Sequence, residues 1–144
     1  MALLGVDYGA KKIGLAKGDK ASGVATPLKT IANHGQESVR LAIEEICRDE
    51  NVEQIVVGVP LSLHPHRRTT FLRQKDLQNQ QMREVIGFIE WLRQTFDLPV
   101  EIEDERLSTK QANGLTKDLI QQYGDDAVAA MFILQTFLDK EKNS

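Results

Sequence analysis

The chain has little cysteine, no long apolar run and no excess of positive charge, and each of these absences excludes a class of protein. A single cysteine, Cys47, excludes an intramolecular disulfide and is consistent with a reducing compartment. No stretch approaches the roughly 20 apolar residues of a membrane span, and the first residues show no signal-peptide pattern. Lys and Arg number 18 against 21 Asp and Glu, so the net charge of −3 provides no overall basic field for nucleic acid or membrane. We therefore expect a soluble cytoplasmic protein without membrane contact.

Size and composition are those of one ordinary domain. The chain has 144 residues, and 41% of them are hydrophobic, which is enough for a core. We expect residues 1–144 to form a single domain. Cys47 lies on the apolar face of a predicted helix, so we expect it in that core rather than as a nucleophile.

The order of the predicted elements indicates an α/β fold with a mixed five-stranded sheet. Three short strands joined by glycine turns favour antiparallel pairing. The later alternation of helices and strands makes the first, fourth and fifth strands parallel. The predicted strands are Ala2–Asp7, Lys12–Lys17, Val24–Ile31, Ile55–Val59 and Val100–Glu103, and Pro27 makes the third an edge strand. The predicted helices are Gln36–Glu50, Met82–Phe96, a third helix and a last one from Asp126. A capping box of Ser108 and Gln111 opens the third helix, and Gly124 closes it.

Carboxylates occur where the predicted parallel strands end. Asp7 ends the first strand, Glu105 follows the fifth, and Asp125 and Asp126 open the last helix. Ligands of such sheets bind beyond these strand ends, and carboxylates that meet there repel one another unless a cation neutralises them. Oxygen ligands without cysteine or histidine select Mg²⁺ or Mn²⁺, and a pair of these ions suits phosphodiester hydrolysis.

Each of these acids also has a structural alternative. Asp7 can bond the backbone of its own turn, and Glu105 can pair with Arg106 or Lys110 on the surface. One of Asp125 and Asp126 is expected to cap the last helix.

Basic residues gather in one segment. Ser62–Lys75 holds four Arg and Lys, including Arg67 and Arg68, and no acid, whereas 97–105 holds five acids in nine residues. An acidic site beside a basic arm suits a nuclease, because the arm can hold phosphates. The alternative is a solvated loop. Lys11 and Lys12 lie in the turn beside Asp7 and are further candidates for phosphate contact.

Four blocks of the sequence resemble the YqgF/RuvX family. They run in the family's order along the chain: DYGAKKIGLA from Asp7, VGVPL from Val57, DERLST from Asp104 and DAVAAMFIL from Asp126. The resemblance implies an RNase H-like fold and a bacterial cytoplasmic nuclease that matures the 5′ end of pre-16S rRNA; a Holliday-junction resolvase is the older proposal. The family's acids map to Asp7, Glu105 and Asp126. Asp125 stands where the family usually has an apolar residue, so it is the expected cap.

Two departures from the family pattern leave the choice of substrate open. The segment from Ser62 to about Gln81 is longer than is usual and lacks an Asp-Gly turn. The stretch between Thr109 and Asp126 is short and carries only Lys110 and Lys117 as basic residues, where relatives often have a basic loop.

The leading hypothesis is a Mg²⁺- or Mn²⁺-dependent endonuclease acting on structured RNA. Asp7, Glu105 and Asp126 would hold the metal, and Arg106 would orient Glu105 or contact a phosphate. Three alternatives stay open: a resolvase that cuts four-way DNA junctions as a homodimer, a sugar-kinase or actin-like ATPase, which needs two such domains, and a non-catalytic binding module.

Overall fold

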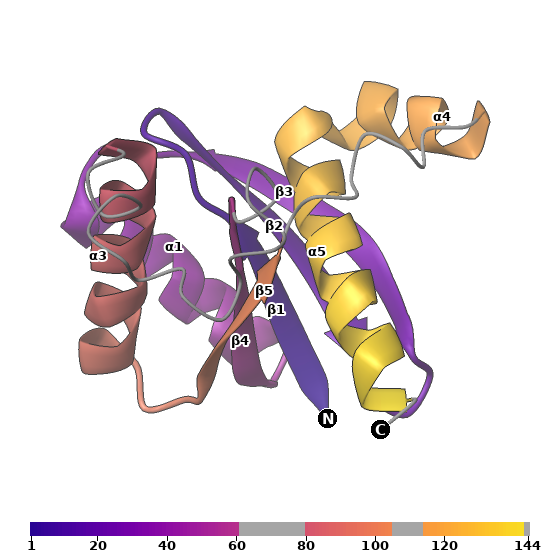
Figure 1. Cartoon of the computed structure of the whole chain (residues 1–144), viewed down its shortest axis with the longest axis horizontal. Coiled ribbons are helices and arrows are strands. Elements are labelled where there is room, and N and C mark those ends of the chain that lie inside the picture. The colour runs from indigo at the N-terminus through magenta and orange to yellow at the C-terminus, as the bar shows by residue number, and fades with distance from the viewer. Residues whose placement is uncertain (61–79, 105–113, 143–144) are drawn as a thin grey trace, which may run out of the picture.

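The computed structural model describes residues 1–60, 80–104 and 114–142 (Figure 1). Within these ranges the order of elements is the predicted one. The strands are β1 (Ala2–Asp7), β2 (Lys12–Asp19), β3 (Val24–Ala32), β4 (Val52–Val59) and β5 (Val100–Asp104), and the helices are α1 (Gln36–Asp49), α3 (Gln80–Thr95), α4 (Gly114–Tyr123) and α5 (Asp125–Lys142).

The five strands form one mixed sheet in the order β3-β2-β1-β4-β5. β1 pairs antiparallel with β2, and β2 pairs antiparallel with β3. β1 and β4 are parallel, as are β4 and β5. The predicted α/β class, the strand directions and the edge position of the Pro27 strand are therefore confirmed. The predicted capping box of Ser108 and Gln111 lies outside the described residues.

Helices cover the two faces of the sheet (Figure 1). α1 and α3 pack on one face, where Leu4 and Val6 of β1 lie among their buried residues. α5 packs on the other face against Leu3 of β1 and Val56 of β4. Successive side chains of a strand point to opposite faces, so a strand covered on both sides is apolar throughout. This arrangement explains the continuous apolar run in β4.

β4 begins earlier than its hydrophobic run. The apolar pattern predicts a strand from Ile55, whereas the structure starts it at Val52. Glu53 and Gln54 interrupt the apolar run, but Val52 is buried and the backbone of this stretch already pairs with β1 through Ala2 and Leu3. Backbone pairing therefore extends the strand beyond the residues that the hydrophobic pattern predicts.

Glycine allows α5 to lie directly on the sheet. A Cβ atom at Gly14 of β2 would lie 1.9 Å from the backbone oxygen of Asp126 and 2.2 Å from its carbonyl carbon. At Gly5 of β1 a Cβ would lie 2.9 Å from the backbone oxygen of Ala130. Both glycines face α5, so only residues without a side chain permit this approach.

We predict that Gly14→Ala destabilises the protein by about 3 kcal/mol, because the new methyl group meets backbone atoms and the start of α5 must move. Gly87→Ala is the matched control. Gly87 lies inside α3, and a Cβ there has nothing within 4 Å, so we expect stabilisation by about 0.5–1 kcal/mol from helix propensity. Urea denaturation of the two variants measures both effects. Wild-type stability of Gly14→Ala would contradict the described contact.

Candidate metal and nucleic-acid site

Asp7 is the last residue of β1, and the strand's alternation places it on the α5 face. Leu3 belongs to the cluster against α5, and Gly5 touches α5 directly, so Asp7 is the next residue on that face. Its register partner across the sheet is Gly14. Asp7 is half-buried.

Asp126 reaches the same place from the other end of the sequence. It is the second residue of α5, it is half-buried, and its backbone carbonyl lies against Gly14. Gly14 is therefore the common neighbour of Asp7, through strand pairing, and of Asp126, through helix packing. The contact brings two of the three predicted metal-binding acids to one edge of the sheet.

Gly124 occupies the junction between α4 and α5. Its φ of 94° is a left-handed conformation that favours glycine. Its N–H donates to the carbonyl of Ile120 at 2.8 Å, which closes α4, and its own carbonyl accepts from the N–H of Val128 at 3.3 Å, which opens α5. The prediction that Gly124 closes the helix is confirmed.

The prediction that Asp125 caps α5 is wrong, because Gly124 holds the position before the helix. Asp125 is instead an exposed residue of the first turn, where a negative charge favours the helix dipole.

The third predicted acid, Glu105, lies outside the described residues, directly after the end of β5 at Asp104. Arg106, Arg67 and Arg68 lie outside them as well. Within residues 1–60, 80–104 and 114–142, no group of three or more His, Cys, Asp or Glu is arranged to hold a metal ion. The metal-binding roles of Asp7, Glu105 and Asp126 and the phosphate contacts of the lysines and arginines therefore stay predictions.

The turn between β1 and β2 presents Lys11 and Lys12 as exposed residues beside Asp7. A Cβ at Gly9 would lie 2.5 Å from the carbonyl oxygen of Lys12, so glycine is needed for the turn itself. Asn33, at the end of β3, holds this turn. Its side-chain amide donates to the carbonyl of Gly9 at 3.0 Å, and its backbone N–H donates to that of Lys11 at 2.9 Å.

Sequence reasoning did not find Asn33. A single asparagine after a strand matches no motif, and only the folded chain brings it to the turn beside Asp7.

Not every acid of the 97–105 run belongs to the site. Glu103 is 4% exposed, and its Oε2 lies 2.6 Å from Nζ of Lys140 on α5. The same oxygen accepts a hydrogen bond from the backbone N–H of Asp104 at 3.2 Å. Glu103 is thus neutralised by an ion pair between β5 and α5, and its role is structural.

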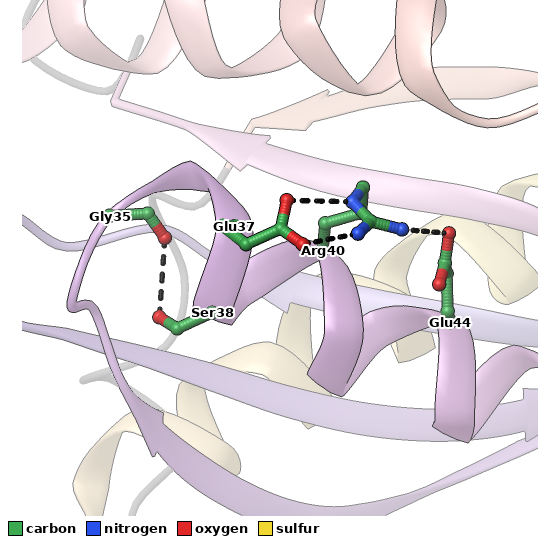
Figure 2. A network of polar contacts seen from close by, with 5 residues as sticks. All are labelled: Gly35, Glu37, Ser38, Arg40 and Glu44. Atoms are coloured by element: carbon green, nitrogen blue, oxygen red, sulfur yellow. Dashed lines mark hydrogen bonds and ion pairs between the residues drawn. The ribbon is translucent and has the colours of Figure 1, made fainter.

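Arg40 of α1 is likewise engaged within its own helix (Figure 2). Its guanidinium group bonds both oxygens of Glu37 on one side and Oε2 of Glu44, at 2.8 Å, on the other. The hydrogen bond from Arg40 lowers the pKa of Glu37. An arginine held by two carboxylates is a poor candidate for phosphate contact, whereas Lys11 and Lys12 are exposed in the turn beside Asp7.

The donor chemistry at the strand end fits the predicted metal. Asp7 and Asp126 offer carboxylate oxygens from half-buried positions. Such hard donors suit Mg²⁺ or Mn²⁺. Carboxylates that come together at one sheet edge favour binding of a cation, because the cation offsets their mutual repulsion.

The chain is similar to known proteins over nearly its whole length. The model of the RuvX family, described as Holliday junction resolvase, matches residues 1–140. A protein of Rickettsia peacockii named "Putative pre-16S rRNA nuclease" is 33% identical over 98% of this chain and 88% of its own length. A protein of the same name from Rickettsia typhi is 34% identical over 97% of this chain and 86% of its own length.

Solved structures show the same fold at low sequence identity. RuvC of T. thermophilus in complex with a Holliday junction substrate superposes with a TM-score of 0.56 at 14% identity, covering 99% of this chain and 96% of that one. The Fowlpox virus resolvase bound to Holliday junction DNA gives a TM-score of 0.51 at 13% identity, covering 98% of this chain and 99% of that one.

The mixed sheet with α5 on one face is the RNase H-like fold of the resolvases, as predicted. The chain belongs to the RuvX family of nucleases, also called YqgF.

We predict that Cys47 reacts slowly with alkylating reagents. Its half-buried thiol packs against the core, and burial, with a smaller effect of Glu44, raises its pKa to about 11. At pH 8 this leaves about a hundred times less thiolate than the ordinary pKa of 9.0. Labelling rates of native and urea-unfolded protein measure the difference, and equal rates would show an open thiol.

We predict that Lys140→Met lowers the free energy of unfolding by about 1–3 kcal/mol, because the buried carboxylate of Glu103 loses its cation. Lys142→Met is the control, since it removes an exposed positive charge from the same helix end. Chemical denaturation compares the two variants. Equal stability would show that the Glu103–Lys140 pair contributes nothing.

Proposed function

We propose that this protein is a Mg²⁺- or Mn²⁺-dependent endonuclease that hydrolyses phosphodiesters of structured nucleic acid, with the 5′ end of pre-16S rRNA as its target. The observation that carries the proposal is that Asp7, by strand pairing, and the backbone of Asp126, by helix packing, are both neighbours of Gly14 at the carboxyl edge of the sheet. This is the edge at which α/β sheets bind ligands.

The candidate residues have two roles in such a reaction, metal binding and phosphate contact. Asp7 and Asp126, with Glu105 as the predicted third ligand, would hold the metal. When bound, a divalent ion supplies Lewis-acid stabilisation of the charge that develops on the phosphate oxygens. Lys11 and Lys12, exposed beside Asp7, attract the phosphates on either side of the cleaved bond. Asn33 keeps their turn in place through its bond to Gly9.

The RNA target is supported by the relatives rather than by the geometry. The two Rickettsia proteins carry the rRNA nuclease name and align over most of both chains. This role also supports the expectation of a cytoplasmic protein. Among the described helices, none has the length and apolar content to cross a membrane.

A four-way DNA junction is the second candidate substrate, because the description of the matching family is Holliday junction resolvase. Symmetric cutting of a junction requires two active sites, and a C2 homodimer provides them. The two substrates thus differ in the oligomeric state that they require.

We predict that Asp7→Asn and Asp126→Asn each reduce metal-dependent cleavage by at least about 100-fold, since each removes a negative ligand from the site. Glu101→Gln is the matched control, because Glu101 is an exposed acid of β5, and we expect it to cleave like the wild type. Assays with Mg²⁺ or Mn²⁺ measure cutting of a pre-16S-like RNA and of a four-way DNA junction.

Preferred cutting of the RNA supports the proposal. Preferred, symmetric cutting of the junction by a dimer, seen in analytical ultracentrifugation, supports the resolvase instead. Unchanged cleavage by Asp7→Asn would refute the assigned metal site.

A further inference from the structure

A pocket of about 340 Å³ opens on the other side of the end of β1, between α1 and α3. Its walls include Tyr8 of the β1–β2 turn, Gln36 of α1, and Glu84, Gly87 and Trp91 of α3. The volume lies within the range of about 300–1,000 Å³ for pockets that take small organic groups.

The pocket adjoins the candidate metal site along the chain. Tyr8 follows Asp7 directly, and the two residues lie on opposite faces of the sheet. Asp7 lies on the α5 face, whereas Tyr8 packs with the cluster under α1 and α3. Neighbouring Cα atoms are only about 3.8 Å apart. A nucleic-acid strand with a phosphate at Asp7 therefore has the pocket within reach of a neighbouring base.

Aromatic rings are concentrated at this place. The chain has 8 Phe, Trp and Tyr residues in all, and four of them form a continuous row through Phe88. The ring of Tyr8 lies 4.5 Å from that of Phe88, Phe88 lies 5.7 Å from Trp91, and Trp91 lies 6.2 Å from Phe96, measured between ring centroids.

Phe88 is buried, which fixes the row, whereas Tyr8 and Trp91 are half-buried and line the pocket. Rigid aromatic side chains that are partly open to solvent are the platforms on which unpaired bases stack.

The polar groups of the pocket favour a base over a phosphate. The carboxylate of Glu84, whose Oε1 accepts from the amide of Gln80 at 3.1 Å, repels a phosphate but can also accept a hydrogen bond from an N–H group of a base. The exposed amide of Gln36 can both donate and accept. Gly87 keeps the wall between Glu84 and Trp91 bare, since a Cβ there would meet nothing within 4 Å.

We propose that this pocket binds an unpaired nucleobase of the nucleic-acid strand whose phosphate lies at Asp7. The inference rests on the proposed function for the nature of the ligand. It adds a positioning contact: a base held against Tyr8 and Trp91 selects substrates with a single-stranded nucleotide beside the cleaved bond.

Trp91 is the only tryptophan of the chain, so its fluorescence reports on the pocket. The first experiment titrates the Asp7→Asn protein, without divalent metal, with a short single-stranded RNA, with the same RNA lacking one base, and with a duplex. We expect saturable quenching by the single strand. We expect about tenfold weaker binding when the stacked base is absent and no quenching by the duplex. Equal quenching by the three nucleic acids would overturn the proposal. Quenching by free nucleosides, with none by the single-stranded RNA, would overturn it as well.

Gly87→Leu provides the second test, because it fills the pocket from a position with open space. We expect it to reduce the affinity for the intact RNA to that for the abasic RNA. Gln94→Leu introduces the same side chain at an exposed position of the same helix that does not line the pocket, and it should bind like the parent protein. Unchanged binding by Gly87→Leu, verified as folded by circular dichroism, would overturn the pocket assignment.

The readout requires no cleavage, so the two proposals can fail separately. Quenching with an inactive wild-type protein would refute the nuclease and keep the base pocket. Cleavage without base-dependent quenching would refute the pocket and keep the nuclease.

Discussion

The backbone contact between β2 and the first turn of α5 is the constraint on which the candidate site depends. Gly14 has no side chain, so the carbonyl of Asp126 can lie where a Cβ would otherwise be. The same glycine pairs with Asp7 in the sheet. A single close approach therefore sets both the depth at which α5 packs and the relation between two carboxylates from opposite ends of the chain. Gly5 continues the contact along the helix, and Figure 1 shows α5 lying along this face of the sheet.

The end of β1 separates two kinds of chemistry. Because side chains alternate along a strand, Asp7 is directed to the α5 face and Tyr8 to the opposite face, among aromatic rings. Asn33 joins the two sides, since it bonds the carbonyl of Gly9 and also accepts from the N–H of Gly35 at the start of α1. The end of β1 thus has an edge with exposed lysines on one side and a row of aromatic rings on the other.

The acidic residues show how far their positions in the sequence predict a site. Asp7 and Asp126 were identified because each stands at the end of a predicted element, and element ends meet at a sheet edge. Glu103 stands two residues from Glu105 in the same acidic run, yet it is buried against Lys140. The strand's alternation and the position of α5 decide that difference, and neither is visible in a count of charges. Asp125 does not cap α5, because the helix begins one residue earlier than its apolar pattern indicates.

The sequence by itself determined the class of fold, the order and direction of the strands, and the family, because hydrophobic periodicity and four ordered motifs are local properties of the chain. Tertiary structure alone decided the contacts by which these elements are held together. The contact of Gly14 with Asp126, the pairing of Glu103 with Lys140 and the contact of Tyr8 with Phe88 all join elements distant in sequence. Such contacts depend on how closely a helix approaches a sheet, and that distance is set by packing in three dimensions.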